Sequence, residues 1–531
     1  MLKKPDKPPL RDIFPLCRSA LGSKRWSRLF NDKTVNPSLN AFLAALRSST
    51  AGPVPPWLPD LARLEWARRA ASRTGAKSGR RITAFTVNPS LQVLKLSWNG
   101  LAAFRPSSGN GVMPEPGVEV LLVWRDPGSR RVLTSTAESG DLLALKMIVE
   151  GIPAEIVAAE GGLPVGAVDA AVDRAAGKGL LLAPPSRIRR DRTVFVSRRP
   201  ADRRFLTASS FTLQWHITQA CDLHCRHCYD RSDRQPPSSD EAVRVLDDLR
   251  TFCRSRNVQG AVSFTGGNPL LHPDFLAIYR AAVERGFSTA ILGNPSPRER
   301  IEEIIRIRMP AFFQVSLEGL RDHNDSIRGT GHFDRIMDFL GVLRELRVPS
   351  MVMLTLTEEN RDQVLPLSEL LREKTDVFHF NRLALFGKGA NLRMADRKNY
   401  RAFLENYLRA AKKNPVMGFK DNLINILRRE KSRELFGGCT GHGCGAAFNF
   451  VTLLADGEVH ACRKLPSPLG NIREQCLAEI YDSALAKRYR RGPAACKGCP
   501  VRTACGGCLA SAKSHGLDIF KDKDPFCFIA R

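Results

Sequence analysis

The 531-residue sequence predicts an α/β protein made of several parts, and three observations support this prediction. Between residues 209 and 395, short apolar runs alternate with amphipathic segments, as in a parallel sheet flanked by helices. Before this region, helical periodicity is combined with one hairpin signal. After it, residues 436–531 contain nine of the 14 cysteines. We therefore expect a central α/β domain between two parts of different construction.

The composition narrows the class of protein. Apolar residues make up 43% and charged residues 25%, which is typical of a globular chain rather than a disordered, collagenous or coiled-coil one. No run approaches the roughly 18 consecutive apolar residues of a membrane span, and the first residues lack the apolar core of a secretory signal. A cytoplasmic protein without membrane attachment is expected.

The net charge of +27 favours an anionic partner, such as an acidic peptide, a nucleic acid or a membrane surface. An equally simple explanation is an arginine-rich composition with solvated basic faces. Residues 186–208 carry part of the excess, because eight arginines occur there against two aspartates. We interpret this segment as a basic linker.

The N-terminal part is expected to contain two modules. Residues 1–85 place apolar residues at helical spacing and predict a helical region. Within residues 90–185, strand-like runs at 118–124 and 131–136 flank an Asp-Pro-Gly-Ser turn, and three helical segments follow. This order predicts a winged helix-turn-helix-like module, which would bind either a nucleic acid or a peptide.

Six strand–helix units are predicted within residues 209–395. The expected strands are 213–218, 261–265, 289–292, 312–317, 351–357 and 377–385, and the expected helices are 239–254, 273–285, 298–308, 333–346 and 360–373. In such sheets the functional residues gather at the carboxyl ends of the strands. Residues 396–435 predict a helical bridge, and the cysteine-rich residues 436–531 are expected to fold around metal rather than around an apolar core.

Clustered cysteines in a chain without a secretory signal indicate metal binding rather than disulfides. Cys221, Cys225 and Cys228 directly follow the first predicted strand. Three thiolates can bind three irons of one [4Fe–4S] cube and leave the fourth iron open for another ligand. A zinc site would instead need a fourth protein ligand, which His224 or His227 could supply.

The spacing of these three cysteines resembles the motif of the radical S-adenosylmethionine (radical SAM) superfamily. The resemblance implies a partial (β/α)6 barrel whose catalytic [4Fe–4S] cluster, held by Cys221, Cys225 and Cys228, binds S-adenosylmethionine. His227 stands at the aromatic position of the motif and is expected beside the cofactor. The implied activity is reductive cleavage of S-adenosylmethionine to a 5′-deoxyadenosyl radical, with an electron from flavodoxin or ferredoxin.

Two later segments are similar to cofactor-binding loops of the same superfamily. The first follows the second predicted strand and consists of Gly266, Gly267, Asn268 and Pro269. It resembles the loop that binds the methionine amino group, although Asn268 stands where the family usually has a glutamate. In the second segment, the resemblance implies that Ser316 contacts the ribose and that Arg328 approaches the methionine carboxylate.

The C-terminal cysteines resemble the SPASM domain, which holds two auxiliary [4Fe–4S] clusters in peptide-modifying radical SAM enzymes. By this resemblance, one cluster would bind Cys439, Cys444, Cys462 and Cys508, and the other would bind Cys496, Cys499, Cys505 and Cys527. The family normally has three residues where Gly506 and Gly507 supply two. A pair of zinc ribbons is the alternative, because the Cys-x-x-Cys pairs also suit zinc.

Two kinds of substrate are compatible with these motifs. The first is a ribosomally synthesised precursor peptide whose leader binds residues 90–185, and the alternative is a nucleic acid or a small metabolite. Residues 165–176 contain a single basic side chain, whereas a helix that reads a DNA groove needs several polar or basic ones, so nucleic acid is disfavoured. Phrases at 213–221, 264–273 and 291–295 resemble the selenobiotic or thio(seleno)oxazole peptide maturases, which implies modification at or near Cys or Sec.

The predicted leader site has two components. An extended leader could add as a strand to residues 118–124 or to a neighbouring strand. An apolar helix face is expected to receive leader side chains, and it consists of Val168, Ala171, Val172 and Ala175.

Arg463 argues against one activity of related enzymes, the formation of formylglycine. Sulfatase-type maturases have an acidic base directly after the cysteine that Cys462 matches, and Arg463 occupies this position. A guanidinium cannot accept a proton at neutral pH, so formylglycine formation is not expected.

Overall fold

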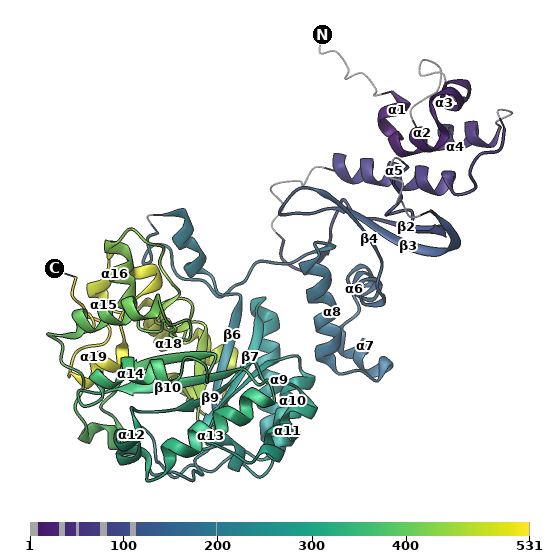
Figure 1. The fold of residues 1–531 in the computed structure, drawn as a ribbon. Helices are drawn as coiled ribbons and strands as arrows, with labels where there is room; N and C mark the ends of the chain where they lie inside the picture. Colours follow the sequence, from purple (N-terminus) through teal and green to yellow (C-terminus); the bar gives the residue numbers. More distant parts are fainter. Residues whose placement is uncertain are drawn as a thin grey trace. The chain divides into compact units, whose positions relative to one another are not determined.

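The computed structural model describes residues 9–30, 38–48, 52–74, 82–106, 113–197 and 199–529. The chain separates into two compact units, residues 1–185 and residues 186–531 (Figure 1). No helix among the described residues is long and apolar enough to cross a membrane.

The second unit is built on one nine-stranded sheet in the order β11-β10-β9-β8-β7-β6-β12-β13-β14. The first six of its strands in sequence are all parallel, and they are β6 (Ser210–Thr218), β7 (Gln259–Gly266), β8 (Ser288–Leu292), β9 (Phe313–Ser316), β10 (Ser350–Leu356) and β11 (Val377–Arg382). They match the six predicted strands within a few residues. A sheet of parallel strands in a mixed α/β fold is therefore confirmed.

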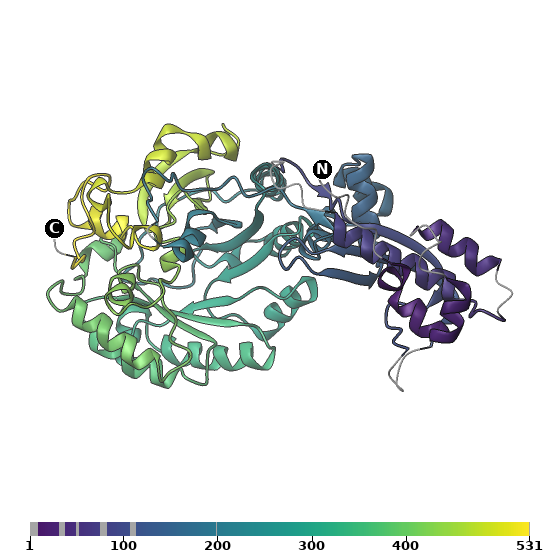
Figure 2. The same ribbon diagram turned by 90° about the horizontal axis from the view of Figure 1, so that it is seen from above.

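Helices follow these strands in sequence and lie along the outside of the sheet (Figures 1 and 2). They are α9 (Ser239–Arg256), α10 (Phe275–Glu284), α11 (Arg298–Ile307), α12 (Arg321–Arg328), α13 (His332–Glu345) and α14 (Val364–Leu370). The start of α9 is fixed locally by a capping box, in which Ser238 accepts from the Glu241 amide and Glu241 accepts from the Ser238 amide. Apolar side chains such as Leu246 and Phe264 are fully buried between helices and strands.

From the sequence we expected the C-terminal region to fold around metal rather than around an apolar core, but the structure shows an apolar core there. Strand β12 (Phe450–Leu453) pairs in parallel with β6, and β13 (Glu458–Cys462) and β14 (Leu465–Asn471) continue the sheet. All four residues of β12 are buried, and one apolar core extends from the parallel strands β6 to β11 into this region. The cysteines therefore stand on a scaffold shared with these strands.

The remaining elements of this unit connect or cover its C-terminal cysteines. Between the two regions lie α15 (Tyr400–Ala411) and α16 (Ile424–Glu430), and after β14 come α17 (Leu477–Asp482), α18 (Ala484–Arg491) and α19 (Leu509–Ser514). Residues 186–208, which we predicted as a basic linker, belong to the second unit rather than running between units. A 3-10 turn at Pro200–Leu206 buries Phe205 and Leu206 against this unit.

The first unit contains a three-stranded antiparallel sheet in the order β2-β3-β4, with helices packed on both faces. The strands are β2 (Gln92–Asn99), β3 (Glu115–Arg125) and β4 (Val132–Thr136). Helices α1 (Leu10–Ile13), α2 (Pro15–Leu21), α3 (Ser23–Leu29), α4 (Leu39–Arg47) and α5 (Leu58–Arg73) precede the sheet, and α6 (Ser139–Glu150), α7 (Ala154–Gly161) and α8 (Val165–Gly177) follow it. A two-stranded pairing of β1 (Thr86–Val87) with β5 (Leu181–Leu182) closes the second group.

The two predicted N-terminal modules share this sheet. Leu96, Leu121 and Val123 pack with the preceding helices, whereas Leu122 and Trp124 pack with the following ones. This alternation is the period-2 pattern of a strand buried on both faces. The winged-helix interpretation of residues 90–185 itself remains a prediction.

The predicted leader site needs correction in part. Strand β3 pairs with β2 and, from Leu121 to Arg125, with β4, so the free edges of the sheet belong to the neighbouring strands β2 and β4, which were the alternative to residues 118–124. The residues expected to form an open apolar surface are instead buried in the core of the unit, at 5% exposure or less, and they are Val168, Ala171, Val172 and Ala175. The amphipathic pattern of α8 reflects packing within the unit.

Candidate functional site

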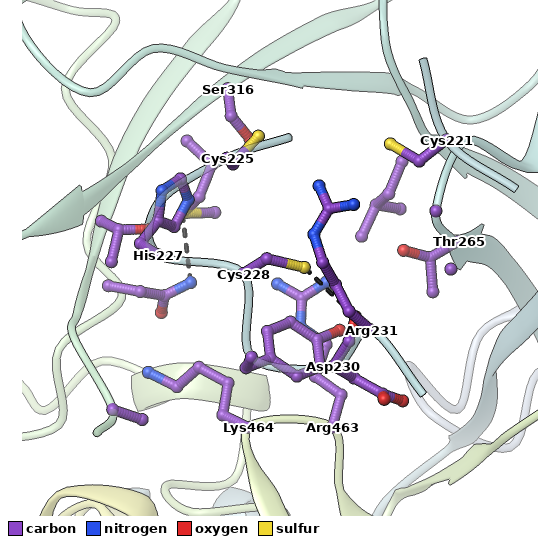
Figure 3. Close-up of a pocket in the computed structure, with 18 of the residues that line it drawn as sticks. Cys221, Cys225, His227, Cys228, Asp230, Arg231, Thr265, Ser316, Arg463 and Lys464 are labelled. Atoms are coloured by element: carbon purple, nitrogen blue, oxygen red, sulfur yellow. Dashed lines mark hydrogen bonds between the residues drawn. The ribbon is translucent and has the colours of Figure 1, made fainter. Parts of the chain in front are cut away.

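One cavity lies at the carboxyl ends of the parallel strands, where such sheets place their functional residues (Figure 3). It brings together eight of the predicted residues, which are Cys221, Cys225, His227, Cys228, Gly266, Gly267, Ser316 and Arg328. Asn268 and Pro269 lie beside the cavity but do not line it. The residues come from the loop after β6, the end of β7, the end of β9 and the end of α12.

The three cysteines stand in a loop that its neighbours hold in place. The Arg226 amide donates to the Ile327 carbonyl at 3.0 Å, which ties the loop to α12. Asn294 donates from Nδ2 to the Cys221 sulfur at 3.6 Å, and Arg328 donates from Nη1 to the Cys225 sulfur at 3.6 Å. Polar donors around thiolates stabilise their negative charge, so this environment suits a thiolate-bound cluster.

The two glycines after β7 allow the backbone to approach the cysteine loop closely. Gly267 and Asn268 donate their amides to the carbonyls of Thr218 and Ala220, at 2.9 and 2.7 Å. A β-carbon on Gly266 would collide with the Thr218 carbonyl, and one on Gly267 would collide with the Ala220 carbonyl. Gly266 also has φ of +127°, a conformation that favours glycine. These glycines therefore fit a cradle for the predicted cofactor beside Cys221.

The substitution of Asn268 for the family's glutamate has a physical explanation in its neighbour Asp222. Asn268 is buried, and its Nδ2 donates to Asp222 Oδ1 at 3.2 Å. Asn294 donates to the same oxygen at 2.7 Å. A carboxylate at position 268 would face the Asp222 carboxylate without a donor between them, and like charges at such a distance repel strongly. An amide is the group that this site accepts.

Arg328 does not stand free to meet a carboxylate of the cofactor. Its guanidinium forms a buried ion pair with Glu318, whose Oε1 lies 2.6 Å from Nη2 and 3.0 Å from Nε. The second oxygen of Glu318 accepts from the Thr355 amide at 2.7 Å. Burial raises the pKa of Glu318, but the charges of His227 and Arg328 outweigh it and hold the pKa below its usual range. Both partners are therefore charged at neutral pH.

His227 lies against this pair. Its Nε2 is 3.4 Å from Arg328 Nη2 and 3.3 Å from Glu318 Oε1, and burial lowers its pKa. Its Nδ1 is buried without a hydrogen-bond partner among the described residues. An unpaired buried nitrogen next to the cysteine loop fits a site that a further group completes.

Two residues of the C-terminal region line the same cavity as the three cysteines. Arg463 and Lys464 follow β13 and enter the cavity from the strand ends of that region (Figure 3). Lys464 donates to the Arg382 carbonyl at 2.9 Å, and the Arg382 side chain is itself neutralised by Asp421 and Asp524. This wall of the cavity therefore carries positive charge toward any substrate.

Sequence analysis did not identify Asp222, Asn294 or Glu318. Glu318 directly follows the strand-end Ser316-Leu317 and precedes Gly319, a position at the functional edge of a parallel sheet. That position was the available signal. Asp222 and Asn294 offered none, because their contact joins segments 72 residues apart.

The C-terminal cysteines form two groups. Burial raises the pKa of the Cys444 thiol to about 12, and the neighbouring Cys462, Cys508 and Cys439 contribute to this rise. The pKa of the Cys505 thiol is raised by burial and by a different set of neighbours, which are Cys496, Cys499 and Cys527. Each group contains four sulfurs and therefore fits a cluster with one thiolate for each iron. The assignment of these residues as ligands remains a prediction.

These cysteines do not form a compact single-ion site. Within the described residues, no group of three or more His, Cys, Asp or Glu side chains is close enough to hold one metal ion. In a [4Fe–4S] cube, by contrast, each thiolate binds its own iron.

Comparison with known proteins identifies two domains. Residues 215–371 match the model of the radical SAM superfamily, and residues 444–500 match that of the SPASM iron–sulfur cluster-binding domain. The AdoMet-dependent heme synthase of Methanosarcina barkeri is 26% identical over 350 residues, which cover 61% of this chain and 97% of that protein. The mycofactocin maturase MftC of Mycobacterium tuberculosis is 26% identical, over 59% of this chain and 82% of its own.

A solved structure shares the fold. The chain is similar, with a TM-score of 0.50 and 16% identity, to Streptococcus suis SuiB in a crystal structure bound to its precursor peptide SuiA, over 77% of this chain and 96% of SuiB. The radical SAM domain implies a [4Fe–4S] cluster with S-adenosylmethionine, and the SPASM domain implies auxiliary iron–sulfur clusters. The chain is thus an enzyme in which a radical SAM domain is followed by a SPASM iron–sulfur domain.

Proposed function

We propose that this enzyme modifies a ribosomally synthesised precursor peptide at or near Cys or Sec residues, as a maturase of the selenobiotic or thio(seleno)oxazole type. The observation that carries the catalytic part is the single cavity shared by Cys221, Cys225, Cys228 and the Gly-Gly loop. The peptide substrate is supported by similarity to a maturase and by the shared fold of SuiB, which binds a precursor peptide.

The protein's own residues would bind and orient the reactants. Cys221, Cys225 and Cys228 would hold a [4Fe–4S] cluster which, with S-adenosylmethionine bound, supplies a radical that abstracts hydrogen from an unreactive carbon. Glu318 fixes the Arg328 guanidinium beside Cys225, so that its charge is already in place before the cofactor binds.

The cationic wall would select the substrate. Arg463 and Lys464 cannot accept a proton at neutral pH, so they do not replace the base of sulfatase-type maturases. They are suited to hold a carboxylate or a carbonyl of the substrate opposite the three cysteines.

The first unit would bind the leader of the precursor. Its sheet leaves unpaired strand edges at β2 and β4, onto which an extended peptide can add by main-chain hydrogen bonds. Val93 on β2 and Leu133 on β4 are exposed apolar side chains on these edges. We expect removal of residues 1–185 to weaken precursor binding about a hundredfold, or about 2.7 kcal/mol, while iron content persists. Unchanged affinity in a fluorescence-anisotropy titration would exclude the leader role.

The substrate class can be tested with a candidate precursor, a short cysteine-rich peptide encoded beside the gene. Incubation with reduced enzyme and S-adenosylmethionine should change the peptide mass, and tandem mass spectrometry should place the change at or near Cys. The matched control is the enzyme with Cys221, Cys225 and Cys228 replaced by Ala. A peptide left unmodified while S-adenosylmethionine is cleaved would contradict the proposal for that precursor.

A small carboxylate-bearing metabolite is the second candidate. It is favoured by the similarity to a heme synthase along nearly the whole length of that protein, and by the positive wall of the cavity. Iron coproporphyrin III, the compound named for another relative, the Fe-coproporphyrin III synthase of Methanosarcina barkeri, provides the test when incubated under the same conditions. Conversion of such a tetrapyrrole, with no change in any candidate peptide, would replace the peptide assignment.

A further inference from the structure

Two buried arginines lie between the two groups of C-terminal cysteines. A small cavity is lined by Cys444 of one group and by Cys496 and Cys505 of the other, and Arg190 and Arg502 line the same cavity. Arg190 belongs to residues 186–208, outside the matched SPASM segment, and Arg502 stands in the loop between Cys499 and Cys505. Neither arginine has a role in the function proposed above.

Arg190 is held in place entirely by backbone carbonyls and aromatic rings. It donates to the Cys444 carbonyl at 2.5 Å and to the Arg490 carbonyl at 2.6 Å. Its guanidinium carbon lies 3.9 Å from the ring centre of Phe448 and 4.7 Å from that of Phe195. Only 6% of the residue is exposed.

Arg502 has the same kind of surroundings. It donates to the Arg491 carbonyl at 2.6 Å and to the Pro493 carbonyl at 3.2 Å, and it is 5% exposed. Its guanidinium carbon lies 4.9 Å from the ring centre of Phe195, the ring that Arg190 also approaches. One phenylalanine thus packs against both cations.

Neither guanidinium has a carboxylate as its countercharge in the part of the chain that the structure describes. Among the described residues, no carboxylate forms an ion pair with Arg190 or Arg502, and the Nε of each is buried without a hydrogen-bond partner. A buried cation without a counterion is strongly unfavourable, because the charge has left water without compensation. The nearby groups that can carry negative charge are sulfurs and, beside Arg190, the phenol of Tyr481, whose pKa is raised by burial. Cys444 is an electrostatic neighbour of Arg190, and Cys496 and Cys499 are electrostatic neighbours of Arg502.

We propose that Arg190 and Arg502 form a cationic bridge between the two auxiliary clusters, neutralising their thiolates and raising their reduction potentials. The proposal rests on the assignment of these cysteines as cluster ligands. One-electron reduction adds negative charge to a cluster, and a fixed cation nearby stabilises the reduced form more than the oxidised form. Residues 186–208 are then a part of the electron-transfer region that the SPASM motif does not contain.

The test measures midpoint potentials and needs no substrate. We would use the full chain with Cys221, Cys225 and Cys228 replaced by Ala, so that only auxiliary clusters contribute to the EPR signal of an anaerobic redox titration. Arg190→Gln or Arg502→Gln should lower an auxiliary potential by at least about 59 mV, a tenfold change in the one-electron equilibrium. Arg190→Lys and Arg502→Lys keep the charge and should restore most of the potential.

Arg256→Gln is the matched control, because Arg256 also has a buried, unpaired Nε but pairs with Asp482. Its replacement should leave both potentials unchanged. Unchanged potentials in the Arg190 and Arg502 variants at full iron content would overturn the proposal. If a Gln variant loses iron, the matching Lys variant tests the proposal instead. A Lys variant that keeps all its iron but has a midpoint potential lowered by about 59 mV or more would also overturn the proposal. Zinc in place of iron and sulfide would refute the ligand assignment, while the radical SAM site could still modify a peptide.

Discussion

The loop of Cys221, Cys225 and Cys228 differs from the C-terminal cysteine groups in whether its buried arginine is paired with a carboxylate. At the loop, Arg328 is neutralised by Glu318 before any cofactor is present. Around the C-terminal cysteines, Arg190 and Arg502 have carbonyls and rings but no carboxylate among the described residues. The first arrangement leaves the local charge balanced for a cofactor that enters and leaves. The second is balanced only when a permanent anion is present.

The largest expected effect separates the two regions by iron content. Replacing Cys221, Cys225 and Cys228 with Ala should remove about four of about twelve irons, because three four-iron clusters are implied. Formation of 5′-deoxyadenosine should cease, since the cluster proposed at the loop is the one expected to bind S-adenosylmethionine.

Iron and sulfide analysis with chromatographic detection of the nucleoside provides the measurement. The matched variant replaces Cys17, Cys253 and Cys476, which belong to neither group, and should keep all the iron. Loss of all iron in the loop variant would show that the two regions do not load independently.

The second prediction concerns Glu318, the carboxylate that neutralises Arg328 at the loop. Glu318→Gln leaves Arg328 buried without its anion, which should lower the free energy of unfolding by about 3–5 kcal/mol. The denaturant midpoint of the apoprotein measures this change. A double variant, Glu318→Gln with Arg328→Met, removes both charges and should recover much of the loss. Equal destabilisation in both variants would mean that packing, not charge, holds this pair.

How far sequence predicted these regions depends on the range of the contacts involved. The six strands and their helices were predicted because apolar periodicity is written in consecutive residues, as in β6 and α9. Strands β12 to β14 were missed because they form by extending the sheet: β12 pairs with β6, more than 200 residues earlier, and β13 and β14 pair onto β12 in turn. The same limitation hid the Asp222 and Glu318 contacts, which exist only after distant segments meet.

The helix face assigned to the leader shows a different limit. Val168 and Val172 have the spacing of an apolar stripe, and such a stripe is identical in sequence whether it meets a peptide or the protein's own core. In this molecule it meets Leu122 and Trp124 of the sheet. The cysteine groups could be proposed in advance because the motif spacing is specific, whereas an apolar stripe is not.

A third prediction sharpens the comparison at the loop itself. Asn268→Asp would place a second carboxylate against Asp222, where the present amide donates at 3.2 Å. The lost hydrogen bond and the repulsion together should cost about 1–3 kcal/mol of stability near Cys221. Slower or incomplete cluster loading, followed by absorbance during anaerobic reconstitution, is the expected result. Asn268→Asp combined with Asp222→Asn should load normally, and failure of this pair to do so would contradict the explanation.

The smallest expected effect concerns the wall that the C-terminal region contributes to the catalytic cavity. Arg463→Gln removes one positive charge but keeps a polar side chain, so substrate affinity should fall about tenfold, or about 1.4 kcal/mol, if a substrate carboxylate lies there. Cleavage of S-adenosylmethionine without substrate should be unchanged, because Arg463 belongs to neither cysteine group. The difference in affinity should shrink as salt is added, since the charge acts partly through solvent. Sulfatase-type maturases have an acidic residue at the position of Arg463, and the native chain is therefore not expected to form formylglycine. Formylglycine formed by the native chain and detected by mass spectrometry would refute the role assigned to this cation.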